Sequence, residues 1–257
     1  MYAHACPRMP LGLPHRVAPR ADPERVRAAV ADVARFGPPY PLYLDPGTAA
    51  LSRQQLCEPS QLRSLLGAIG DRVGSDEDRV TASTLQYGFA ARCWSLVLGA
   101  WQRGGVVIDL RGLGYVVNPS GSVDLALNDF RGWEGSSMEF DEVVEVMAYS
   151  ILSDQFTGFH AALRGVARVA DGLLWGNAAS ALSSGARRVA AGRSDDRVTP
   201  LATALLSRAP LRNKMVSAPV GGARRSTCCL WYRTRDRTKC GDCPLTERAV
   251  LRRDVRH

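Results

Sequence analysis

The feature that most limits how this 257-residue chain can fold is a group of cysteines near its C-terminus. Four of its seven cysteines fall between residues 228 and 243, in a C-C-x₁₀-C-x₂-C pattern. They are Cys228, Cys229, Cys240 and Cys243. We expect a cytoplasmic chain, whose thiols stay reduced, so such clustering indicates a metal site and not a disulfide framework.

Thiolates are soft ligands, and four of them can complete either a zinc site or an iron–sulfur site. The Cys240-Gly241-Asp242-Cys243 half is a common chelating turn, in which glycine gives the backbone freedom to wrap toward a metal. The adjacent Cys228-Cys229 pair cannot form the two-residue loop that zinc ribbons use twice. A binuclear cluster offers two irons and accepts neighbouring side chains. The residues therefore favour iron–sulfur, with zinc and unliganded thiols as alternatives.

Composition is that of an ordinary soluble protein, with 46% hydrophobic and 23% charged residues. No apolar stretch approaches the roughly 18 residues that a membrane span needs. The first 21 residues lack the continuous apolar core of a secretory signal. We expect a cytoplasmic protein, either free or bound peripherally at the inner face of the membrane.

The formal charge is +8, and arginine supplies nearly all the positive charge because the only lysines are Lys214 and Lys239. Drift in a GC-rich genome explains such a bias, and so does a basic surface for an anionic partner. Several cations flank the four thiols: Arg224, Arg225, Arg233, Arg235, Arg237 and Lys239. They could raise the potential of an anionic cluster, dock an acidic electron donor, or form a solvated loop.

Hydrophobic periodicity predicts a mainly α-helical α+β protein with a small antiparallel sheet near the middle and a C-terminal cluster-binding segment. Helices are expected over residues 23–36, from about Ser60, over 81–103, 140–153, 158–184 with a break near Leu174, and 201–207. Strands are expected at 106–110, 115–117 and 123–127, the last two as a hairpin. Residues 38–47 are proline-rich and predicted to be extended.

We divide the chain into three parts by composition. Residues 1–22 form a leader rich in arginine and proline, and 23–220 form the helical body with a sheet at about 105–130. Residues 221–257 form the cluster-binding segment, and we expect the body and the segment to make one domain. Pro219-Val220-Gly221-Gly222 is predicted to be a flexible approach to the segment.

The cysteine pattern, with Tyr232 after the first pair and Cys-Gly-Asp-Cys-Pro-Leu at 240–245, resembles that of the FhuF-like ferric siderophore reductases. Leu-Trp-Gly-Asn-Ala-Ala-Ser-Ala-Leu at 174–182 and Ala-Ala-Arg-Cys-Trp-Ser-Leu at 90–96 are similar to two helices of that family. The likeness covers about residues 80–246. It implies a [2Fe–2S] cluster on Cys228, Cys229, Cys240 and Cys243, and an oxidoreductase that reduces siderophore-bound Fe(III).

The resemblance also implies partners: a ferric siderophore, of which hydroxamates are favoured, and an external electron donor such as a ferredoxin or its reductase. No catalytic residue is expected beyond the cluster, because one-electron transfer needs no proton-transfer base. Arg233, Arg235 and Arg237 are candidates for docking substrate or donor. Trp175 and Asn177 are candidates for the same role, or for a core role.

The remaining candidates are expected to be structural. Cys6, Cys57 and Cys93 are far apart in sequence and are predicted not to be ligands, and His160 is expected to serve the fold. Gly112-Leu113-Gly114 lacks the strand–glycine–helix context of a nucleotide site, so direct use of NAD(P)H is not expected.

Two other functions fit parts of the pattern. An iron–sulfur redox sensor could bind nucleic acid through its arginines, but no helix-turn-helix or basic helix is evident beside the cysteines, so no stable nucleic-acid partner is expected. A siderophore-binding module with a structural zinc would also use four cysteines.

Overall fold

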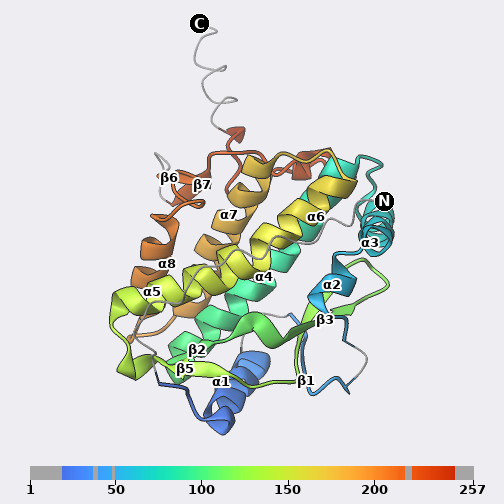
Figure 1. Ribbon diagram of the computed structural model, residues 1–257. Helices are drawn as coiled ribbons and strands as arrows, with labels where there is room; N and C mark the ends of the chain where they lie inside the picture. The colour runs from blue at the N-terminus through green and yellow to red at the C-terminus, as the bar shows by residue number, and fades with distance from the viewer. Residues whose placement is uncertain (1–18, 37–39, 48–49, 218–221, 247–257) are drawn as a thin grey trace, which may run out of the picture.

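The computed structural model describes residues 19–36, 40–47, 50–217 and 222–246, and it has the predicted mainly helical α+β fold (Figure 1). The helices are α1 (Pro23–Phe36), α2 (Arg53–Leu56), α3 (Pro59–Val73), α4 (Asp78–Gly104), α5 (Phe140–Ala148), α6 (Gly158–Val166), α7 (Asp171–Ala190) and α8 (Val198–Leu206). The strands are β1 (Leu42–Leu44), β2 (Val106–Ile108), β3 (Leu113–Val117), β4 (Val123–Leu127), β5 (Gly132–Glu134), β6 (Met215–Ser217) and β7 (Ala223–Arg225).

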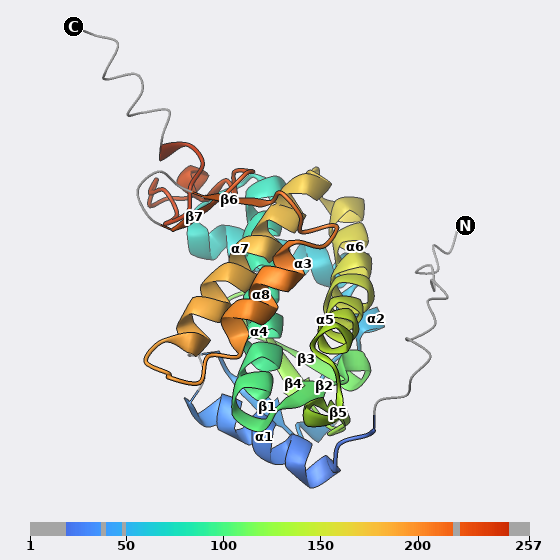
Figure 2. The same ribbon diagram turned by 90° about the vertical axis from the view of Figure 1, so that its left-hand side faces the viewer.

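Helix α4 is the centre of the core, and α1, α3 and α7 pack around it (Figures 1 and 2). Its Trp94 is fully buried, and the indole N–H donates to the Ala178 carbonyl of α7 at 3.0 Å. Gly99 and Gly104 let α1 approach closely, because a Cβ at either would lie 2.6–2.7 Å from a side chain of α1. The small residues of α4 thus decide how near its neighbours lie.

The predicted β-hairpin is confirmed, since β3 and β4 pair antiparallel from Leu113↔Leu127 to Val117↔Val123. Its turn closes through an Asn118 N–H bond to the Ser122 carbonyl, and Gly121 has the positive φ of +77° that the turn requires. The extended segment before Gly47 contributes more than predicted, because β1 adds to this sheet parallel to β4. Strands β2 and β5 form a separate antiparallel pair.

The second helical half differs from its prediction mainly in where the chain breaks. The break expected near Leu174 lies earlier, at residues 167–170, and α7 runs unbroken through Leu174. Ala167 leaves the helix with an extended backbone (φ −138°, ψ 145°), and Asp171 supplies a negative charge to the first turn of α7. Between α5 and α6 the chain stays helical through a π-helix at Tyr149–Thr157.

Pro19, Arg20 and Ala21 lie along β5, where the Ala21 N–H donates to the Gly132 carbonyl at 3.1 Å. Within the described residues, no helix combines the length and the apolar composition needed to cross a lipid bilayer.

Candidate metal centre

The cysteine segment, defined here as residues 222–246, lies at the end of the molecule opposite α1 (Figure 2). Strands β6 and β7 pair antiparallel and contact α7. Strand β7 is the first part of the cysteine segment. The Ser226 N–H donates to the Lys214 carbonyl at 2.8 Å, and the Arg225 N–H donates to the Asp242 carbonyl at 3.2 Å. The segment is therefore folded onto the body. Of its predicted flexible approach, Pro219-Val220-Gly221 lies outside the described residues.

One cysteine from each half of the pattern meets the other in this segment. The Sγ atoms of Cys229 and Cys240 are 3.4 Å apart, so the two halves of the sequence pattern meet. Cys243 is 3% exposed, and its N–H donates to the Cys240 carbonyl, which closes the predicted turn. Within the described part of the chain, no three Cys, His, Asp or Glu side chains surround one point as a single metal ion would require.

The backbone turns sharply directly after the cysteine pair. Leu230 has a positive φ of +66°, which is rare for a bulky residue and marks a constrained turn. This conformation lets the Leu230 N–H donate to the Cys228 Sγ at 3.4 Å. A short 3₁₀ helix, Trp231–Arg233, follows. Burial is the larger effect and raises the pKa of Cys228, and the hydrogen bond from the turn opposes it by stabilising the thiolate.

The contact between Cys229 and Cys240 separates their acidities. The hydrogen bond from Cys240 lowers the pKa of Cys229 to about 6, against the opposing effect of burial, and the positive charge of Arg225 adds to the lowering. The same contact and burial raise the pKa of Cys240. Cys229 is therefore the first of the pair to become a thiolate, which is the form that binds metals.

Asn177 lies beneath the segment and is 1% exposed. Its amide nitrogen donates to the carbonyl and the hydroxyl of Ser83, both at 3.0 Å, and the Ser83 hydroxyl donates to the Cys229 carbonyl at 2.7 Å. Its amide oxygen accepts from Arg225 at 2.6 Å. Asn177 thus holds the segment to α4 and α7, and its side chain offers no docking surface.

Trp175 is also buried, at 8% exposure, and packs edge-on against His160 with 4.4 Å between ring centroids. His160 is 1% exposed and contacts the Gln86 side chain at 3.0 Å, and burial lowers its pKa to about 3. Both rings belong to the interior between α4, α6 and α7, so Trp175 is likewise a packing residue and not a docking one.

The three candidate docking arginines are exposed. Arg233 is bound to Glu77 at the start of α4, with 2.7 Å between Nε and Oε1. Arg235 lies against Gly74, and its N–H donates to the Val73 carbonyl at 2.8 Å. Arg237 has a positive φ of +50°. Arg233 is thus partly neutralised by Glu77, whereas among the described residues no carboxylate forms an ion pair with Arg235 or Arg237.

The other cysteines lie apart from the segment. Cys93 is fully buried in α4, and burial raises its pKa, so it behaves as a small apolar side chain. Cys57 follows α2 and is half-buried. Cys6 falls outside the described residues.

Sequence reasoning missed the polar groups that anchor the segment. Ser83 and Ser180 read as ordinary helix residues, and Arg225 was only one of several nearby cations. The one available signal was Asp242, between two cysteines, because a carboxylate there needs a partner if it is buried.

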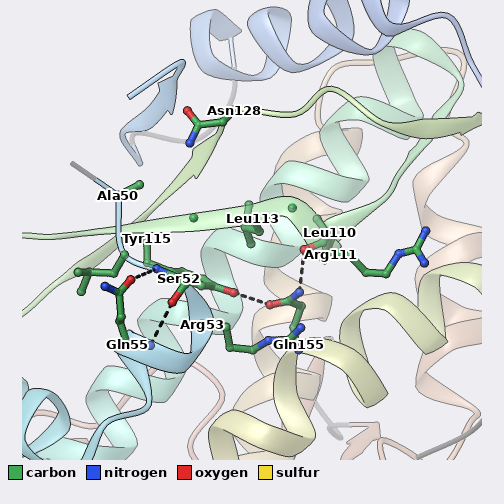
Figure 3. A pocket seen from close by; sticks show the side chains of 13 residues that line it. Ala50, Ser52, Arg53, Gln55, Leu110, Arg111, Leu113, Tyr115, Asn128 and Gln155 are labelled. Carbon is green, nitrogen blue, oxygen red and sulfur yellow. Dashed lines mark hydrogen bonds between the residues drawn. The ribbon is translucent and has the colours of Figure 1, made fainter. Parts of the chain in front are cut away.

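A cavity with a volume of about 350 Å³ lies away from the cysteine segment, between α2, β3 and the π-helix (Figure 3). The Tyr115 hydroxyl donates to the Gln155 amide oxygen at 2.6 Å, and the Gln155 nitrogen donates to the Leu110 carbonyl at 2.9 Å. Its buried polar groups thus satisfy one another, and no residue of the cysteine segment lines it.

Clustered thiols on a helical body suit either an iron–sulfur or a zinc site, and comparison with protein families decides which cofactor is present. Residues 225–245 match the family model of the FhuF 2Fe-2S C-terminal domain, which confirms the resemblance in the segment that carries the cysteines. The protein therefore has a [2Fe–2S] cluster and a redox function of the type that this domain indicates. A comparison with curated proteins found no match to the chain.

The geometry of the segment fits such a group. Soft thiols from both halves of the pattern converge, and a backbone N–H and a buried cation lie beside them. Sulfur-directed hydrogen bonds and nearby charge are the features that tune iron–sulfur sites.

Proposed function

We propose that Cys228, Cys229, Cys240 and Cys243 hold the [2Fe–2S] cluster and that the protein reduces siderophore-bound Fe(III) to Fe(II) in the cytoplasm. The observation that carries the proposal is the convergence of these thiols within the residues that match the FhuF domain. When bound, the cluster would supply a one-electron redox couple, so that one electron from an external donor can reach the ferric substrate.

The chemistry of the substrate explains why one electron suffices. Siderophores bind Fe(III) through hard oxygen donors, and Fe(II) polarises these donors less, so the same ligand holds it far less tightly. The segment's contribution is to place the thiols near the surface: Cys228, Cys229 and Cys240 are only partly buried, while Cys243 and Arg225 lie beneath them. A bulky siderophore therefore needs no internal pocket to come close.

A direct test uses protein reduced chemically under anaerobic conditions and then mixed with a ferric hydroxamate. We expect the visible spectrum to return to that of the oxidised protein, while an Fe(II) chelator traps about one iron per electron delivered. Hydroxamates are the first choice because their Fe(III) complexes are easier to reduce than those of catecholates. Protein that stays reduced with every ferric siderophore, yet binds duplex DNA in a redox-dependent way, would be a sensor instead.

The electron donor is proposed to be an acidic protein such as a ferredoxin, which docks on Arg235 and Arg237 beside the thiols. The double variant Arg235→Glu/Arg237→Glu should accept electrons from the ferredoxin about tenfold more slowly at low salt, because steering by opposite charges is lost. High salt should remove the difference.

The matched control is Arg187→Glu/Arg188→Glu, which makes the same charge change on exposed residues near the far end of α7. Stopped-flow reduction at two salt concentrations measures both variants. Equal slowing by the two double variants would show that total charge matters and that this surface is not the docking site.

A further inference from the structure

Arg225 differs from the other arginines near the thiols because its side chain is only 2% exposed. Its Nε donates to Asp242 at 3.1 Å, and its terminal nitrogens donate to Asn177 at 2.6 Å and to Ser180 at 2.7 Å. Its guanidinium also lies 5.5 Å from the ring centre of Tyr87. A buried cation is stable only when its charge and its N–H groups are paired in this way. The surrounding side chains therefore form a specific binding site for the Arg225 guanidinium.

The contacts of Arg225 join the two halves of the cysteine pattern. On one side it holds Asn177, which bonds Ser83, which in turn bonds the Cys229 carbonyl. On the other side it holds Asp242, which lies between Cys240 and Cys243 and also accepts from the Ser180 hydroxyl at 2.5 Å. One continuous hydrogen-bond network therefore runs from the first cysteine pair to the second.

The charges of this network are stable and shielded from water. Burial is the largest single influence and works against the charged form of Arg225, but the hydrogen bond to Asp242 and the negative charges around it together outweigh burial and raise the pKa of Arg225. Asp242 is its ion-pair partner, with 3.0 Å between the Arg225 Nη2 and the Asp242 Oδ1, and both side chains are largely buried. Both groups stay ionised, and charges at such depth act on the thiols with little screening by water.

We propose that Arg225 is a positioning residue that fixes both cysteine pairs and raises the reduction potential of the cluster, while Asp242 lowers it. The proposal rests on the ligand set proposed above. Reduction adds negative charge among the thiolates, so a buried cation beside them favours the reduced state and a buried anion opposes it. The exposed Arg237 should contribute little, because water screens its charge.

The test is an electrochemical titration of the holoprotein at constant pH, without any siderophore. Arg225→Gln should lower the ratio of reduced to oxidised protein at a fixed potential about tenfold, equal to a shift of about 59 mV. Asp242→Asn, which keeps a hydrogen-bonding side chain, should shift the ratio in the opposite direction. Arg225→Lys keeps the positive charge but loses the planar guanidinium, and its potential should stay near that of the wild type. The potential of Arg237→Gln should match the wild type.

Opposite signs for Arg225→Gln and Asp242→Asn separate a charge effect from loosened structure, which would move both variants the same way. If Arg225→Gln loses its cluster, the reduction potential of Asp242→Asn still tests whether buried charges tune the cluster, because that potential should rise. Unchanged potentials in cluster-bearing variants, or shifts of one sign, overturn the proposal. Failure to reduce siderophores would leave these potentials unaffected, so the two proposals fail separately.

Discussion

Replacing Cys240 with serine is expected to abolish both the visible absorption of the cluster and the release of Fe(II) from a ferric siderophore. The substitution removes the thiol that lies 3.4 Å from Cys229 and joins the two halves of the site. A serine hydroxyl is a harder donor that stays protonated near neutral pH, so it replaces a thiolate poorly on iron. The iron and sulfide contents, measured chemically, should fall well below the roughly two of each per chain expected for the wild-type protein.

The matched control changes the cysteines that lie outside the segment. The triple variant Cys6→Ala/Cys57→Ala/Cys93→Ala should keep its colour and its iron content. Alanine is preferred at Cys93 because a serine hydroxyl there would be buried in an apolar helix interface. Loss of the chromophore in the triple variant, with circular dichroism unchanged, would show that the ligand set has been assigned wrongly.

Gly176→Ala is expected to detach the cysteine segment from α7 without touching a ligand. A Cβ on Gly176 would lie 2.0 Å from the Thr227 Oγ1, directly before the first cysteine. The hydroxyl would have to move away from the Gly172 carbonyl, which it contacts at 3.4 Å, or the segment would have to shift. Such overpacking costs about 1–3 kcal/mol, so the variant should lose its cluster faster on heating.

A second substitution should reverse this loss. In Gly176→Ala/Thr227→Ala the clashing hydroxyl is gone, and the new Cβ meets the Cβ of residue 227 at an ordinary 3.4 Å. Gly165→Ala in α6 is the control away from the cysteine segment, because a Cβ there meets no atom within 4 Å and Gly165 lacks a positive φ. Visible absorption and circular dichroism during thermal unfolding measure all three. A double variant no more stable than Gly176→Ala would mean that the contact is not what limits the segment.

Local patterns in the sequence predicted the parts of the fold that local forces control. Alternating apolar residues around Asn118-Pro119-Ser120-Gly121 predicted the β3–β4 hairpin, because a turn and its flanking strands are neighbours in the chain. The parallel pairing of β1 with β4 was not predictable, since the partners are about 80 residues apart and a short proline-rich strand carries little periodicity of its own. The break before α7 was misplaced because Ala167–Ala170 contains no glycine or proline to mark it.

The sequence by itself located the [2Fe–2S] chemistry at the C-terminus, because four thiols crowd into one short segment and the matched domain covers that segment. Only the tertiary structure decided how that chemistry is supported. It buries Arg225 and leaves Arg235 and Arg237 in water, although all three are equally arginines in the sequence. It also brings Ser83 and Asn177, 94 residues apart, under the Cys229 carbonyl. Burial and long-range hydrogen bonds depend on how α4 and α7 pack, and no spacing within the cysteine segment encodes that packing.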